Sequence, residues 1–136
     1  MSVRESNPPS GIPLNSVHLQ RGGAFLIAGI VSGAFGAHAM EAVLDADGLD
    51  AFETASRYLL FMGAAILGAT ATRNEAGLGW VEWGTLLFSG SIFLLLLLKN
   101  MGWPVALLGP VTPIGGALMI GGWVLWLRSL RSGEGG

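Results

Sequence analysis

The chain has 136 residues, enough for one domain, and only 12% of them are charged while 51% are hydrophobic. Soluble domains carry about 25% charged residues, so this composition indicates an integral membrane protein. The net charge of −2 provides no basic face for nucleic acid. The lack of cysteine excludes disulfides, thiolate metal sites and thiol catalysis.

Uncharged gaps divide the chain into segments about as long as helices that cross a bilayer. Roughly 20 helical residues cover an apolar core about 30 Å thick. We therefore expect an all-α fold, an integral membrane four-helix bundle, in contact with the lipid bilayer. The predicted spans lie near residues 18–40, 53–73, 80–98 and 104–127. The predicted organisation is a polar tail (1–16), a four-span domain (17–130) and a C-terminal tail (131–136).

The first span ends in GAFGAHAM and contains one ionisable ring, His38. We expect a structural role, with a neutral imidazole that is hydrogen-bonded to Glu41, Arg57 or Tyr58, because a low dielectric favours the uncharged form. A proton, metal or cofactor site is the alternative, since ionisable residues inside membranes are usually functional. His18 should lie about 30 Å away at the other face of the bilayer, which argues against a bis-histidine haem or metal site.

The second span is expected to begin before its apolar core. Asp50 followed by Glu53 is a variant of the capping box, and Glu53 with Arg57 forms an i,i+4 pair in the favoured order. This start places Glu53, Arg57 and Tyr58 at the same outer interface as His38.

The third span, WGTLLFSGSIFLLLLL, contains ten Leu, Ile or Phe residues. They favour insertion by roughly 3–6 kcal/mol. We expect its leucine run, 94–98, to face lipid or a partner.

The fourth span is interrupted by GPVTPIGG. Pro110 and Pro113 each remove a backbone donor, so this helix is expected to be kinked or broken there, with Thr112 as a cap. Broken helices mark binding sites in transporters, but we favour a simple proline kink.

Small residues at a spacing of four allow helices to approach closely in lipid. They predict that spans one, two and four pack tightly together. The candidate packing residues are Gly29, Gly33, Ala37, Gly68, Gly115 and Gly116.

The distribution of Lys and Arg predicts that both termini are cytoplasmic, because cytoplasmic loops carry the excess of these residues. The side with the termini carries five of them, and the opposite side carries Arg57 and Lys99. The five are Arg4, Arg21, Arg73, Arg128 and Arg131.

Four motifs occur in order: GAFGAHAM, FETASRY, SGS and GPVTPIGG. Together they resemble the domain-of-unknown-function family 423, small membrane proteins that include the transmembrane protein 256-like members, over about residues 20 to 130. The resemblance implies a four-span inner-membrane protein and no particular reaction. Members usually carry an aromatic residue, His and Ala after the RY pair, where this chain has Phe61, Met62 and Gly63. This departure favours the packing role for His38.

The sequence contains no nucleophile–base pair, phosphate-binding loop or paired intramembrane carboxylates. We therefore expect a protein that is not an enzyme and binds no cofactor or metal, located in the bacterial inner (cytoplasmic) membrane. The favoured function is an accessory or structural subunit packed against other membrane-protein subunits. The alternative is a small transporter or channel-like bundle with a polar pocket near His38 and Thr112.

Overall fold

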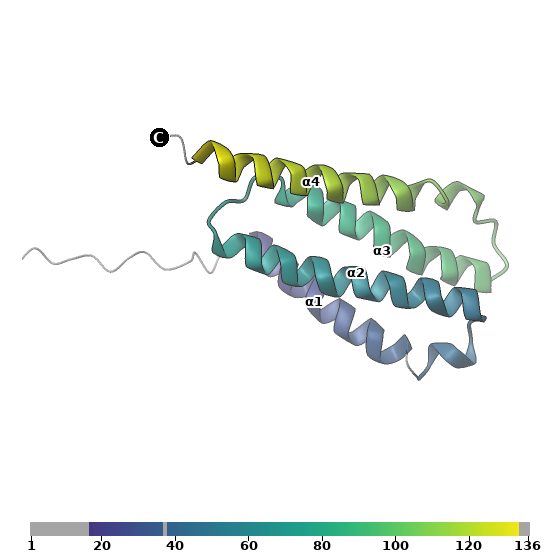
Figure 1. Cartoon of the computed structure of the whole chain (residues 1–136). Coiled ribbons are helices and arrows are strands. Elements are labelled where there is room, and N and C mark those ends of the chain that lie inside the picture. The colour runs from purple at the N-terminus through teal and green to yellow at the C-terminus, as the bar shows by residue number, and fades with distance from the viewer. Residues whose placement is uncertain (1–16, 37, 134–136) are drawn as a thin grey trace, which may run out of the picture.

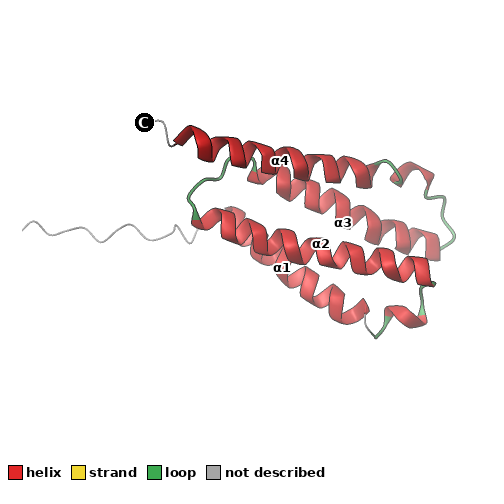
Figure 2. Ribbon diagram, viewed as in Figure 1, coloured by secondary structure: helices red, strands yellow, loops and turns green. Residues whose placement is uncertain are grey.

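The computed structural model describes residues 17–36 and 38–133, and every regular element within them is helical (Figures 1 and 2). This confirms the predicted all-α fold of four helices. Two short 3-10 turns, η1 (Met40–Ala42) and η2 (Ala106–Leu108), precede the second and fourth helices. The helices are α1 (Val17–Gly36), α2 (Ala46–Ala71), α3 (Leu78–Asn100) and α4 (Val111–Gly133).

The start of α2 differs from the prediction. Asp45 is its N-cap, and the Asp45 carboxylate accepts a hydrogen bond of 2.8 Å from the backbone N–H of Gly48. Because this cap precedes Asp50, Glu53 and Arg57 lie about two to three turns inside the helix and are not at its beginning.

The first two helices form a hairpin whose backbones touch. A Cβ atom added to Gly29 would lie 2.6 Å from the backbone nitrogen of Leu60, and one added to Gly63 would lie 2.5 Å from that of Leu26. Glycine is therefore required at both positions for α1 and α2 to pack at this distance.

The last two helices form a second hairpin of the same kind. A Cβ atom at Gly84 would lie 2.6 Å from the nitrogen of Met119, and one at Gly115 would lie 2.5 Å from that of Phe88. The fourth helix thus packs on α3, whereas the sequence predicted that it packs with spans one and two. Leu96, in the predicted lipid-facing run, is only 8% exposed.

The two hairpins meet along α2 and α3. The buried Ser89 hydroxyl donates a hydrogen bond of 2.9 Å to the carbonyl of Ala55. Nearby, the rings of Phe52 and Phe93 pack edge to face at 5.0 Å. The helices are thus arranged in the order of the chain, with α1 and α4 on the outside (Figure 1).

The predicted kink in the fourth helix is not confirmed. Helix α4 begins after Pro110 and continues to Gly133, with Pro113 in its first turn. A proline there costs no internal hydrogen bond, since the first N–H groups of a helix have no acceptor within it.

Two of the described helices are long and apolar enough to cross a membrane, namely α3 and, over Val111–Ser132, α4. The charged residues of the first hairpin lower the hydropathy of α1 and α2.

Candidate functional site

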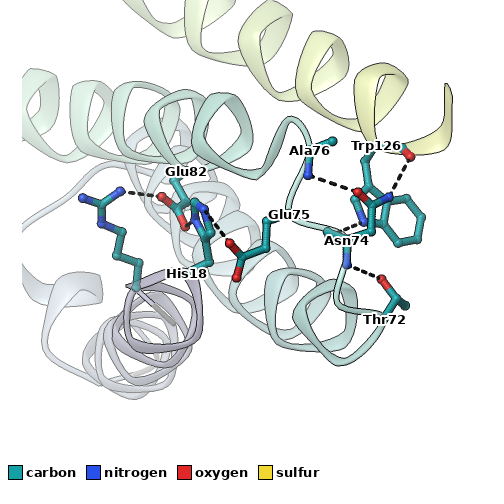
Figure 3. A network of polar contacts seen from close by, with 8 residues as sticks. His18, Thr72, Asn74, Glu75, Ala76, Glu82 and Trp126 are labelled. Atoms are coloured by element: carbon teal, nitrogen blue, oxygen red, sulfur yellow. Dashed lines mark hydrogen bonds and ion pairs between the residues drawn. The ribbon is translucent and has the colours of Figure 1, made fainter. Parts of the chain in front are cut away.

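The most deeply buried charge of the described chain belongs to Glu82, near the start of α3. Its side chain is 3% exposed, and both carboxylate oxygens have partners on α1 (Figure 3). Oε1 lies 2.5 Å from His18 Nδ1, and Oε2 accepts a hydrogen bond of 2.8 Å from Arg21 Nη1. Two side chains from the first turns of α1 therefore form hydrogen bonds with one carboxylate.

A second carboxylate completes this group, which we call the Glu82 cluster: His18, Arg21, Glu75 and Glu82. Glu75, in the loop between α2 and α3, lies 4.0 Å from His18 Nε2. A buried carboxylate is tolerated when partners neutralise it and satisfy its oxygens. The cluster therefore holds α1 against α3 and presents no nucleophile next to a free base.

The sequence did not predict this cluster. The predicted third span, 80–98, contained Glu82 without assigning it a role, and His18 served only as an argument against haem. One signal was available: in the predicted topology His18, Arg21 and Glu82 all lie at the cytoplasmic interface. Oppositely charged residues at one depth are expected to pair in a membrane protein.

A neighbouring group of hydrogen bonds joins the α2–α3 loop to the end of α4 (Figure 3). The side-chain amide of Asn74 donates to the Ser129 hydroxyl at 2.6 Å and to the Trp126 carbonyl at 3.3 Å. In return, the Trp126 indole N–H donates to the Asn74 carbonyl at 3.1 Å. At this end of the molecule, the Glu82 cluster therefore joins α1 to α3, and the Asn74 hydrogen bonds join the α2–α3 loop to α4.

Glu53 and Arg57 lie on α2, away from the Glu82 cluster, and unlike Glu82 they are exposed. Ser89 is the middle residue of α3, which has 23 residues, and its hydroxyl binds the Ala55 carbonyl. Glu53 and Arg57 are each two residues from Ala55, so they lie about 3 Å from the level of that midpoint. The structure thus places both residues near the level of the middle of α3.

Both of these side chains are exposed on α2. Within the described residues neither is joined to a partner by an ion pair or hydrogen bond, so the predicted Glu53–Arg57 pair is not formed. They border a hollow of about 220 Å³ between α1 and α2, where Ser56 is buried. The floor on the α1 side consists of Gly29 and Gly33.

His38 follows α1 in a turn, and its side chain is exposed. Its backbone N–H donates to the Phe35 carbonyl at 3.3 Å. In the described part of the chain its ring has no hydrogen bond to Glu41, Arg57 or Tyr58, unlike the predicted anchor. Glu41 lies in η1 and is also exposed.

Tyr58 and Thr112 make contacts far from His38. The Tyr58 ring packs on Phe88 at a centroid distance of 4.4 Å. The Thr112 hydroxyl lies 2.7 Å from that of Ser91, where it joins α4 to α3. Since α1 and α4 lie on opposite sides of the molecule, His38 and Thr112 do not line a common polar pocket.

The candidate packing residues divide into two groups. Gly29 and Gly115 lie at close backbone contacts, and an added Cβ at Gly116 would meet Phe88 at 3.9 Å. Around Gly33 and Gly68 an added Cβ would meet no described atom within 4 Å, so these glycines are not at a helix contact of this chain. Ala37 lies outside the described residues.

A groove of about 860 Å³ with almost entirely apolar walls lies between α1 and α3. Its α1 wall includes Ala24, Ala28 and Ser32, and its α3 wall runs from Leu86 to Asn100. Among the described residues no set of His, Asp or Glu side chains is arranged to hold a metal ion.

Comparisons with known proteins identify a family of membrane proteins. Residues 32–116, more than half of the chain, match the model of the family described as "Protein of unknown function (DUF423)". The UPF0382 membrane protein of Staphylococcus saprophyticus is 36% identical over 100 residues, covering 69% of this chain and 79% of that protein.

Two further relatives are also described as membrane proteins. The UPF0382 membrane protein of Staphylococcus haemolyticus is 34% identical over 104 residues, 72% of this chain and 81% of the relative. The UPF0382 inner membrane protein YgdD of Escherichia coli K12 is 33% identical over 105 residues, 72% of this chain and 76% of the relative. No solved structure matches the chain significantly.

Proposed function

Since the chain belongs to the DUF423 family of membrane proteins, we propose that it is a non-catalytic subunit that binds another membrane protein in the groove between α1 and α3. In this proposal all four helices span the bacterial inner membrane, and both termini are cytoplasmic. YgdD of Escherichia coli is described as an inner membrane protein, which supports this location.

The observation that carries the proposal is the shape of the groove. Its α3 wall, from Leu86 to Asn100, is about 21 Å long by helical rise. On the α1 wall, Ala24, Ala28 and Ser32 are spaced by four residues and leave the groove open. Small residues at this spacing let another helix approach the backbone closely. An apolar transmembrane helix of a partner protein fits both the length and the chemistry.

The four-span topology is supported by the packing of the first hairpin. Helix α2 lies against α3, and the Ser89 hydroxyl binds the Ala55 carbonyl at the midpoint of α3. If α3 crosses the bilayer, α2 must lie within it as well. Helix α1 then accompanies α2, because their backbones touch at Gly29 and Gly63.

The orientation is tested with cysteines, because the chain has none of its own. Cysteines that replace Ser2 and Asp47 should label from opposite sides of the membrane, with Ser2 reached only from the cytoplasm. Labelling of Ser2→Cys by an impermeant reagent from the outside would overturn the proposed orientation.

The groove is tested with a photo-reactive amino acid at Val31, one of its lining residues. We expect one discrete protein adduct in intact membranes. The adduct should be lost when Ala28→Trp fills the groove and kept when Trp replaces Ile120, which is 69% exposed on α4. An adduct with phospholipid alone, or a protein adduct indifferent to Ala28→Trp, would refute the proposed binding role.

A further inference from the structure

We propose that the outward face of α2 is the contact between two copies of this chain, in which Glu53 of each copy pairs with Arg57 of the other. The inference rests on the four-span placement given above. It concerns a different surface from the groove, because the hollow beside Glu53 and Arg57 lies between α1 and α2.

The first argument is the depth of the two charges. They lie level with the middle of α3, and both are exposed. Insertion of an Arg or Asp at the centre of a membrane helix costs about 2.5–3.5 kcal/mol, so such residues face a bundle interior, a water-filled cavity or an opposite charge. Within the described chain neither Glu53 nor Arg57 has an ion-pair partner. Another protein surface is therefore needed to cover them.

The second argument is the pattern of the face on which they lie. Residues 50, 57, 64 and 71 recur every seven positions, as along the seam of a parallel coiled coil. Phe61, on the same face, is 58% exposed, and an added Cβ at Gly68 would meet no described atom within 4 Å. The exposed residues of this face, here named the α2 seam, are Asp50, Glu53, Arg57, Phe61, Ala64, Gly68 and Ala71.

The third argument identifies a second copy as the occupant. Two copies in one membrane are related by a two-fold axis along the membrane normal, so the same patch must complement itself. Glu53 and Arg57 carry opposite charges on one face, about 6 Å apart along the axis. Parallel helices join charges offset by a similar distance in coiled coils. The two-fold axis would then form two identical pairs and neutralise all four charges.

The hollow beside the charges provides room for this exchange. Its volume is about 220 Å³, and its lining includes both charged residues as well as Gly29 and Gly33. The Ser56 hydroxyl on its wall is already bonded to the Phe52 carbonyl at 3.0 Å. The Arg57 stem of the second copy can therefore lie over the glycines while its guanidinium reaches Glu53.

Cysteine cross-linking in native membranes tests the contact. We expect Ala64→Cys, on the α2 seam, to form a disulfide-linked dimer on oxidation. Ile120→Cys, exposed on α4, is the matched control for random collision and should stay at least tenfold less cross-linked. Equal cross-linking at the two positions would overturn the proposal.

Charge exchange tests the pairing itself, with Ala64→Cys as the reporter. Glu53→Arg alone and Arg57→Glu alone should each reduce homodimer cross-linking at least tenfold. When the two variants are co-expressed with different tags, mixed dimers should return to at least half of the parental level. Failure of the mixed pair to recover, or no loss in the single variants, would refute the exchange of Glu53 and Arg57 between copies.

Milder variants guard against a failure of insertion. Glu53→Gln keeps the shape of the side chain and Arg57→Gln shortens it, and both variants stay polar without a charge, so each should weaken the cross-link severalfold. The Val31 adduct in the groove serves as an independent readout. Loss of the seam cross-link with the groove adduct intact supports the dimer, and an intact seam with no groove adduct refutes only the proposed binding role.

Discussion

Two groups of charged residues lie within the helices, and the fold treats them in opposite ways. At the Glu82 cluster, the buried carboxylate is paired with Arg21 and hydrogen-bonded to His18 inside the chain. On the α2 seam, Glu53 and Arg57 are exposed. The first group stabilises one copy of the protein, so its removal should lower the stability of the monomer. The second contributes little to a single copy, which is why we assign it to assembly.

The largest effect is expected when the carboxylate of the Glu82 cluster is removed. Glu82→Ala should lower the free energy of unfolding in detergent by about 3 kcal/mol, at the lower end for a broken buried ion pair, because Arg21 is half exposed. The matched control is Glu53→Ala, which should cost less than about 0.5 kcal/mol in the monomer. Thermal or denaturant unfolding of the monomer measures both, and equal losses would abolish the distinction between the two groups.

Two glycines of α2 provide the same contrast for packing, because Gly63 touches α1 and Gly68 lies on the exposed α2 seam. Gly63→Ala places a methyl group against the α1 backbone and should cost about 2 kcal/mol, within the range for overpacking. Gly68→Ala, on the α2 seam, meets open space and should be neutral, or stabilising by up to about 1 kcal/mol from helix propensity. Melting temperatures of the monomeric variants decide the matter, and a larger loss for Gly68→Ala would reverse the assigned faces.

The two histidines offer a smaller contrast. His18→Leu leaves one oxygen of Glu82 without its partner and should cost about 1–2 kcal/mol, the penalty for an unsatisfied buried polar group. His38→Leu should be nearly silent, because the His38 side chain is exposed in a turn. Unfolding in detergent tests the pair. A severe loss for His38→Leu would restore the anchor that the sequence predicted.

The smallest effect is expected at the cap of α2, outside both groups. The Gly48 backbone N–H and then the Lys99 ammonium lower the pKa of Asp45 below its usual value, which is about 3.9. The cap should therefore contribute stability fully above about pH 4 and lose it as the pH falls through the lowered pKa. A titration of stability should show a shallow step that disappears in Asp45→Asn, and a step of unchanged size would assign it to another group.

Composition and spacing were sufficient to predict the number of helices and two of the glycines at which helices touch, but not the partner helix of the fourth span. Gly29 and Gly115 were expected at close helix contacts and lie there. The same spacing rule also selected Gly33 and Gly68, which face open space in one copy. A spacing of four identifies a smooth helix face, but it does not identify the helix that covers it. That information comes from tertiary packing alone.

The charged sites were harder to predict because their depth depends on helix boundaries. The sequence placed the start of α2 near Asp50, and the Asp45 cap moves it to Ala46. This shift of four residues takes Arg57 from about two turns to about three turns inside the helix. Glu82 was missed although the predicted span 80–98 contained it, because its position in the second turn of α3, facing α1, depends on how the two hairpins pack.

The chain presents its less apolar hairpin to the membrane first. Synthesis proceeds from the N-terminus, so α2, with Glu53 and Arg57, is complete before the ribosome has made α3. From Ala71 to Asn100 the chain grows by 29 residues, which takes roughly 1.5–6 s at about 5–20 residues per second. During that interval the hydrogen bonds from Ser89 to the Ala55 carbonyl and between His18 and Glu82 have not yet formed. In the proposed four-span topology, the first hairpin must therefore be held in place until the strongly apolar third helix is made.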